Sequence, residues 1–157
     1  MHVADIMHTD VKAADAEDTF ADVAKVMRSN GISSVVVLDK ASKLSGIVTE
    51  RDIVNLIAAG GDPHSVKVVH GMTRRHLETC SSKDDIVDAA DQMVSLNIRH
   101  LPVVDKGKVV GIISIRDLTR WAAEELSGGH EMPDIARSTV ALRAATELQK
   151  QRRKGAS

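Results

Sequence analysis

Gly46-Ile47-Val48-Thr49-Glu50-Arg51-Asp52-Ile53 recurs 65 residues later as Gly111-Ile112-Ile113-Ser114-Ile115-Arg116-Asp117-Leu118. Each copy has the pattern of a buried strand that ends on a hydroxyl residue, just as an amphipathic helix begins. An Arg follows the hydroxyl residue at two positions and an Asp at three. Helix N-termini that follow strands favour phosphate, because their backbone N–H groups are unpaired. The doubled stretch therefore predicts two equivalent strand-to-helix junctions that are suited to an anion.

The helix that precedes each junction is also repeated. Apolar residues at i, i+3, i+4 and i+7 predict one buried helix face in each half. These residues are Phe20, Val23, Ala24 and Met27 in the first half, and Ile86, Ala89, Ala90 and Met93 in the second. Gly31 and Asn97 follow the two helices, and both residue types tolerate the left-handed conformation of a C-cap. Asp15 and Asp18 stand where a capping-box pair would begin the first helix.

Short apolar runs complete each half. Residues 32–38 and 44–48 predict a hairpin of two strands, and residues 99–104 and the run from Val109 predict its counterpart. A helical turn at 3–7, matched by one at 69–72, opens each half, and a brief strand is expected around Val11. Each half thus becomes a small, mainly three-stranded sheet with two helices.

The repeat divides the chain into residues 1–62, 63–127 and a tail at 128–157. A unit of about 60 residues is marginal alone, so we expect the halves to pack about a pseudo-twofold axis. This is an α/β fold. The tail has no counterpart in the first half, and residues 135–154 are a helix candidate that docks on a partner subunit or on its own body.

Composition excludes several classes of protein. A net charge of −1, one Phe, one Trp and no Tyr argue against nucleic acid as the main partner. We find no apolar run long enough for a membrane span, and no secretory leader, so we expect a cytoplasmic protein. The single Cys80 excludes an internal disulfide, and the His residues lack metal-ligand spacing, so we expect no metal.

The doubled order helix, strand, strand, helix resembles a tandem CBS-domain protein. The resemblance is carried by Asp5-Ile6-Met7, by Leu101-Pro102-Val103-Val104-Asp105 and by the two closing stretches quoted above. It covers residues 3 to about 126. It implies a non-catalytic sensor module that needs no cofactor and binds AMP, ADP, ATP or S-adenosylmethionine as a regulatory ligand in a cleft between its repeats. It also implies a homodimer and a regulated protein partner.

The family's motif assigns roles to particular residues. The hydroxyls of Thr49 and Ser114 would meet ribose or phosphate, Asp52 and Asp117 the ribose diol, and Arg51 and Arg116 the phosphate. The starts of the central strands, Ile32-Ser33-Ser34 and Ile98-Arg99-His100, would line the adenine and phosphate sides. Backbone near Val11 and Leu77 would complete the two nucleotide-binding sites.

Other interpretations compete with this one. Thr49 with Asp52, and Ser114 with Asp117, also fit capping boxes, in which case the chain is a ligand-independent dimerisation or adaptor protein. A transcription-linked regulator that uses the basic tail is a further alternative. If the sites are real, they are unequal, because Arg99 and His100 accompany only the Asp117 site. We therefore expect a phosphate-bearing ligand to prefer that site.

Overall fold

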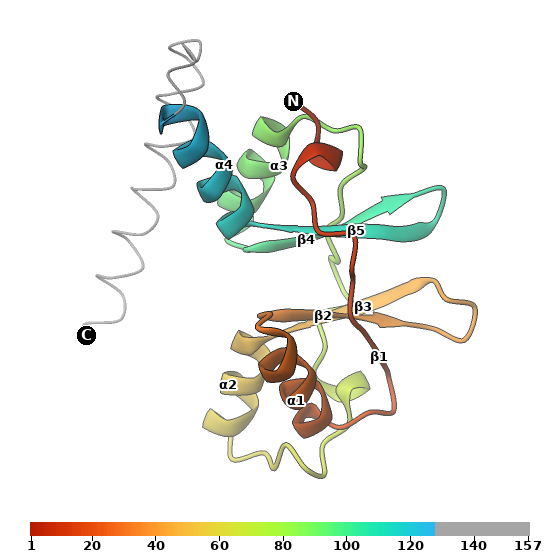
Figure 1. Ribbon diagram of the computed structural model, residues 1–157. Helices are drawn as coiled ribbons and strands as arrows, with labels where there is room; N and C mark the ends of the chain where they lie inside the picture. The colour runs from red at the N-terminus through yellow and green to blue at the C-terminus, as the bar shows by residue number, and fades with distance from the viewer. Residues whose placement is uncertain (128–157) are drawn as a thin grey trace. The chain divides into compact units, whose positions relative to one another are not determined.

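The computed structural model describes residues 1–127 (Figure 1). The expected tail at 128–157, with its helix candidate, lies outside the described residues. In the described part, no helix is long and apolar enough to cross a bilayer.

Residues 1–127 form two small sheets and four α-helices, which confirms the expected α/β class. The elements of the first half are η1 (Val3–Asp5), β1 (Ala13–Asp15), α1 (Phe20–Asn30), β2 (Ser34–Leu38), β3 (Leu44–Thr49) and α2 (Glu50–Ala58). Those of the second half are η2 (Val68–His70), α3 (Ile86–Ser95), β4 (His100–Asp105), β5 (Lys108–Ser114) and α4 (Ile115–Ser127). The strand expected around Val11 begins instead at Ala13.

The elements gather into two compact units whose bounds differ from those of the sequence repeats. Within residues 1–127, one unit contains residues 9–79 and 104–111, and the other contains 1–8, 80–103 and 112–127. The opening segment of each repeat is therefore grouped with the other repeat's elements. We call residues 1–8 and 66–73 the exchanged segments.

The unit of residues 9–79 is built on a three-stranded sheet in the order β1-β2-β3. β1 pairs with β2 in parallel and β2 with β3 antiparallel. Helices α1 and α2 contact each other and lie against β2 and β3 (Figure 1). The predicted stripe of α1 supplies Phe20, Val23 and Met27 to the core, and Gly31 ends the helix with φ at +63°, as expected.

The start of α1 corrects the expected cap. Thr19 is the N-cap residue and Asp22 its partner: the Thr19 Oγ1 accepts a hydrogen bond from the Asp22 N–H at 3.2 Å. Asp15 and Asp18 form a turn one step earlier, where the Asp15 N–H donates to the Asp18 carboxylate at 2.9 Å. A capping box needs a side chain that accepts at the first helical residues, and the helix begins only at Phe20.

The exchanged segment 66–73 is hydrogen-bonded to this unit along its length. The backbone N–H of Val68 donates to the Asp18 carbonyl at 2.8 Å and that of Val69 to the Ala16 carbonyl at 2.9 Å. Thr73 and Ile47 exchange a pair of backbone bonds at 2.9 and 3.0 Å. The segment thus pairs with β3 just before Thr49.

The exchanged segment 1–8 makes the matching contacts in the other unit. The N–H of Val3 donates to the Asp84 carbonyl and that of Ala4 to the Ser82 carbonyl, both at 2.9 Å. His8 and Ile112 exchange a pair of backbone bonds at 2.9 Å. Figure 1 shows η1 beside α3 in this unit. All four predicted stripe residues of α3 are buried.

The second repeat keeps only two of the three expected strands. β4 pairs with β5, and the place of β1 is taken by a single parallel bridge between Cys80 and Val103. In the first repeat, the Val36 N–H donates to the Lys12 carbonyl at 3.2 Å. The residue that corresponds to Val36 is Pro102, which has no N–H to donate. The parallel ladder is therefore reduced to one bridge.

Candidate functional site

Each compact unit holds one of the two predicted junctions. Thr49 ends β3 and α2 begins at Glu50, whereas Ser114 ends β5 and α4 begins at Ile115. The N–H of Glu50 donates to the Ser33 carbonyl at 3.1 Å, and that of Ile115 donates to the Arg99 carbonyl at 3.0 Å. Each helix start is thereby tied to the residue before its central strand.

Asp52 folds back on the residue that ends β3. Its Oδ2 accepts hydrogen bonds from the Thr49 N–H at 2.7 Å and from the Thr49 Oγ1 at 2.8 Å. The side chain is half-buried. Asp52 therefore stabilises the start of α2, which is the capping role that the sequence left open.

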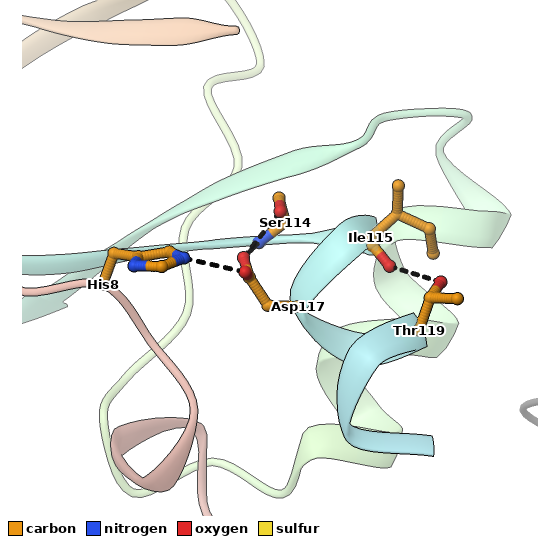
Figure 2. A network of polar contacts seen from close by, with 5 residues as sticks. All are labelled: His8, Ser114, Ile115, Asp117 and Thr119. Atoms are coloured by element: carbon orange, nitrogen blue, oxygen red, sulfur yellow. Dashed lines mark hydrogen bonds and ion pairs between the residues drawn. The ribbon is translucent and has the colours of Figure 1, made fainter. Parts of the chain in front are cut away.

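Asp117 makes the same two contacts and one more. Its Oδ2 accepts from the Ser114 N–H at 2.8 Å and from the Ser114 Oγ at 2.6 Å. Its Oδ1 lies 2.8 Å from Nε2 of His8. The Asp117 side chain is only 5% exposed, while that of His8 is 58% exposed. Figure 2 shows the imidazole and Ser114 approaching the carboxylate from different elements, with Thr119 bonded to the Ile115 carbonyl one turn along α4.

The cationic candidates lie on the backbone segments that adjoin the two junctions. Arg51 and Arg116 are exposed in the first turns of α2 and α4, and Arg99 is exposed at the approach to β4. His100 is half-buried as the first residue of β4. Arg51 and His100 both take part in polar contacts in this structure. The junction with Asp117 therefore has Arg99 and Arg116 at its two adjoining backbone segments.

The central strand of the first repeat begins beside Thr49. Ser34 is buried and pairs with Thr49 in the β2–β3 ladder, so the structure brings these two predicted residues together. Ser33 is half-buried just before the strand. Ile32 is half-buried and packs against the hydrophobic core, and its part in binding stays a prediction.

Three further predicted residues lie outside helices and strands. Ile98 is half-buried, and its N–H donates to the Met93 carbonyl at 2.9 Å as α3 ends. Val11 and Leu77 are half-buried in extended connections, at the approach to β1 and after η2. Their part in binding stays a prediction.

His8 is the polar residue that sequence reasoning missed. Alignment of the repeats places His8 opposite Thr73, because each follows the Met of an opening turn. Both also occupy the same backbone position: His8 pairs with Ile112 two residues before Ser114, and Thr73 pairs with Ile47 two residues before Thr49. The alignment alone reveals the difference between the residues, but it cannot reveal that segment 1–8 reaches Asp117.

Both junctions carry the same kinds of polar group. A carboxylate, a hydroxyl and the N-terminus of a helix of eight or more residues meet at each one. Within residues 1–127, no three His, Cys, Asp or Glu side chains are grouped so as to hold a metal ion. A carboxylate accepts hydrogen bonds from a diol, while helix N–H groups and Arg side chains attract an anion.

Comparison with known proteins agrees with the doubled fold. A model of the CBS domain matches residues 3–59 and again residues 67–124. A 17.7 kDa protein of Acidianus ambivalens is 37% identical over 119 residues, which are 75% of this chain and 71% of that protein. The mitochondrial CBS domain-containing protein CBSX3 of Arabidopsis thaliana is 31% identical over 134 residues, 78% of this chain and 65% of that protein.

Solved structures show the same fold. The CBS domain pair of protein MJ0100, in complex with 5′-methylthioadenosine and S-adenosyl-L-methionine, superposes with a TM-score of 0.74 at 27% identity. The match covers 80% of this chain and 98% of that one. The repeat, the α/β fold and the two matches of the domain model together show that this chain belongs to the CBS-domain family, as a tandem pair.

Proposed function

We propose that this chain is a non-catalytic sensor module that binds an adenosine-containing ligand at its two strand-to-helix junctions. The first site is built on Thr49, Arg51 and Asp52, and the second on Ser114, Arg116 and Asp117. The observation that carries this proposal is the repetition of one polar arrangement, with the same hydrogen bonds, in both units. Capping accounts for the carboxylate at each helix start, but it does not account for the Arg before each carboxylate.

The physical basis is the match between each junction and a nucleotide. An ionised carboxylate accepts strong, charge-assisted hydrogen bonds from the vicinal hydroxyls of ribose. The same carboxylate repels phosphate, and the adjacent Arg together with the N–H groups of the first helical turn offsets that repulsion. The MJ0100 pair, which shares this fold, was solved with two adenosine compounds. AMP, ADP, ATP and S-adenosylmethionine are therefore the ligands that we propose.

The two sites should differ in their preference for phosphate. The backbone that adjoins Ser114 carries Arg99 and His100, whereas the backbone that adjoins Thr49 carries Ser33 and Ser34. An additional Arg near the ligand stabilises a phosphate through charge-assisted hydrogen bonds. We propose that AMP gains more over adenosine at the Asp117 site than at the Asp52 site. Binding would act on a partner protein by favouring one of two arrangements of the module.

Thermal unfolding with adenosine, AMP, ADP, ATP and S-adenosylmethionine tests this function. A ligand at 100 times its dissociation constant should stabilise the folded protein by about 2.7 kcal/mol. Isothermal titration of Asp52→Ala and Asp117→Ala variants then assigns the sites, since each substitution should remove one of them. Circular dichroism of both variants checks their folding. If none of these compounds stabilises the wild-type protein, the proposed function is wrong.

A ligand-independent dimerisation module is the second candidate, and one observation favours it. Helix α2 exposes Val54 (63%) and Ile57 (56%), three residues apart on one face, and exposed apolar helix faces are common in protein interfaces. The homodimer that we propose would bury them. Sedimentation of the wild-type protein and an Ile57→Glu variant, with and without AMP, separates the two functions. A dimer that forms equally in both conditions, without any AMP binding, would support the adaptor.

A further inference from the structure

The contact between His8 and Asp117 distinguishes the second junction from the first. The two residues are 109 positions apart in the sequence, and their side chains meet at 2.8 Å within one compact unit. The backbone pairing of His8 with Ile112 sets the imidazole beside the carboxylate. The contact is therefore built by the exchanged segment and does not depend on α4 alone.

The consequence of this contact depends on how many hydrogen bonds the Asp117 carboxylate can accept. The two oxygens of an aspartate offer about four acceptor positions. At Asp117, Ser114 donates two hydrogen bonds to Oδ2 and His8 is bonded to Oδ1, so three positions are taken. A ribose diol donates two hydrogen bonds, and only about one position remains for it.

Asp52 differs in this respect. Within the described residues, Thr49 donates both of the hydrogen bonds that Asp52 accepts, and both end on Oδ2. The position that corresponds to His8 is Thr73, whose backbone pairs with Ile47 in the same way. The Thr73 side chain makes no hydrogen bond to Asp52 there. Asp52 thus keeps room for both hydroxyls of a diol.

We propose that His8 determines the specificity of the Asp117 site by competing with the ribose diol for the Asp117 carboxylate. This inference rests on the proposed function. With His8 in place, Asp117 accepts one ligand hydroxyl, and full recognition of ribose requires the imidazole to leave. Because the His8 side chain is 58% exposed, it can turn into solvent without opening the core. The Asp117 site therefore binds a ribose diol more weakly than the Asp52 site does.

This role is separate from the phosphate preference proposed above. Arg99 and Arg116 act on the phosphate, so their effect lies in the ratio of AMP affinity to adenosine affinity. His8 acts on the diol, so its effect lies in the adenosine affinity itself. It also lies in the ratio of adenosine affinity to 2′-deoxyadenosine affinity, because the deoxynucleoside donates only one hydroxyl to the carboxylate.

A His8→Thr substitution tests the proposal, because it gives the Asp117 site the residue found at the Asp52 site. Titrations at one fixed pH use the Asp52→Ala background, with calorimetry and with fluorescence of Trp121. This residue is the sole tryptophan of the sequence and lies one helical turn after Asp117. Removal of one competing hydrogen bond to a charged group should tighten adenosine binding about tenfold. The preference for adenosine over 2′-deoxyadenosine should rise as well.

Two further variants separate competition from a general change in structure. His8→Gln keeps a side-chain N–H that can donate to Oδ1, so its adenosine affinity should stay near that of the parent protein. Thr73→His, measured in an Asp117→Asn background, places an imidazole at the first junction and should weaken adenosine binding there. Nitrogen chemical shifts of the His8 ring should change when adenosine is added, because the imidazole leaves Asp117.

The possible failures are distinguishable. If the parent protein binds adenosine compounds but His8→Thr binds adenosine equally or more weakly, the His8 proposal is wrong and the proposed function stands. If the wild-type protein binds none of them, both are wrong. His8→Thr keeps the backbone pairing with Ile112, and its melting temperature, compared with that of His8→Gln, checks that the unit stays folded.

Discussion

Aspartates at helix starts stabilise both compact units through hydrogen bonds to their carboxylates. Asp85 is the N-cap of α3, and its Oδ1 accepts from the Val87 N–H at 2.8 Å. That bond is the main reason why the pKa of Asp85 lies below its usual value. The pKa of Asp22 is lowered chiefly by the Thr19 hydroxyl, which donates to its Oδ2 at 2.7 Å. Both carboxylates are thus favoured in their charged form by folding.

These lowered pKa values predict how stability depends on pH. A carboxyl whose pKa is lower in the folded state contributes stability above its unfolded pKa, about 3.9, and loses it as the pH falls through the folded value. The wild-type protein should therefore be more stable than Asp85→Asn at pH 7, and the difference should vanish in acid below that range. Urea unfolding of both proteins between pH 2 and 7 measures this difference in the free energy of unfolding. A difference that persists at the acid end would contradict this cause.

At the scale of elements, the exchanged segment 66–73 packs against β3 with no spare room. A methyl group added at Gly46 would lie 2.6 Å from the Met72 Sδ and 3.0 Å from the Thr73 carbonyl oxygen. Met72 is buried, so it cannot move aside cheaply. The close approach of segment and strand therefore requires glycine at position 46.

A Gly46→Ala substitution should destabilise the protein by about 1–3 kcal/mol, the usual cost of overpacking a core. Chemical denaturation measures the change, and Ser45→Ala, on the neighbouring position of β3, is the control. The double variant Gly46→Ala/Met72→Ala should lose less stability than the sum of the losses in the two single variants, because Met72→Ala removes the clash with the sulfur atom. Strict additivity of the two substitutions would show that the methyl and Met72 do not meet.

At the scale of the whole molecule, each exchanged segment belongs to one repeat in the sequence but lies in the compact unit that contains most of the other repeat. Val3 and Val68 are fully buried and occupy equivalent places, Val3 with residues 80–103 and Val68 with residues 9–79. Cys80 is the only cysteine of the sequence, and it is buried in the unit that contains Val3. Its thiol therefore reports on the opening of that unit.

Val3→Ala should expose Cys80 to a thiol reagent much more often than Val68→Ala does. Each substitution removes roughly 2 kcal/mol of the stabilisation that comes from burying the valine side chain. This corresponds to more than a tenfold rise in the population of molecules in which that unit is locally open. Labelling rates in native buffer, measured for both variants and the wild-type protein, test this. Equal acceleration by both substitutions would show that the two units open together, as a single cooperative structure.

Much of the fold follows from local pattern. The stripes of α1 and α3, the two hairpins, the left-handed ends at Gly31 and Asn97, and both hydroxyl-to-Asp junctions were predictable, because each depends on residues close in sequence. The expected cap at Asp15 and Asp18 was wrong, since two capping patterns overlap there and only tertiary packing sets where α1 begins. The reduced pairing at Cys80 follows from Pro102, once its partner strand is known.

The amino-acid sequence by itself determined the repeat, the class of fold and the pair of junctions, because side-chain periodicity and helix-start chemistry act over a few residues. Only the tertiary structure decided which opening segment joins which junction. That choice depends on burial of Val3 and Val68 and on backbone pairs between distant strands, such as His8 with Ile112. The contact of His8 with Asp117 follows from it, and so does the difference in diol recognition that we propose for the two sites.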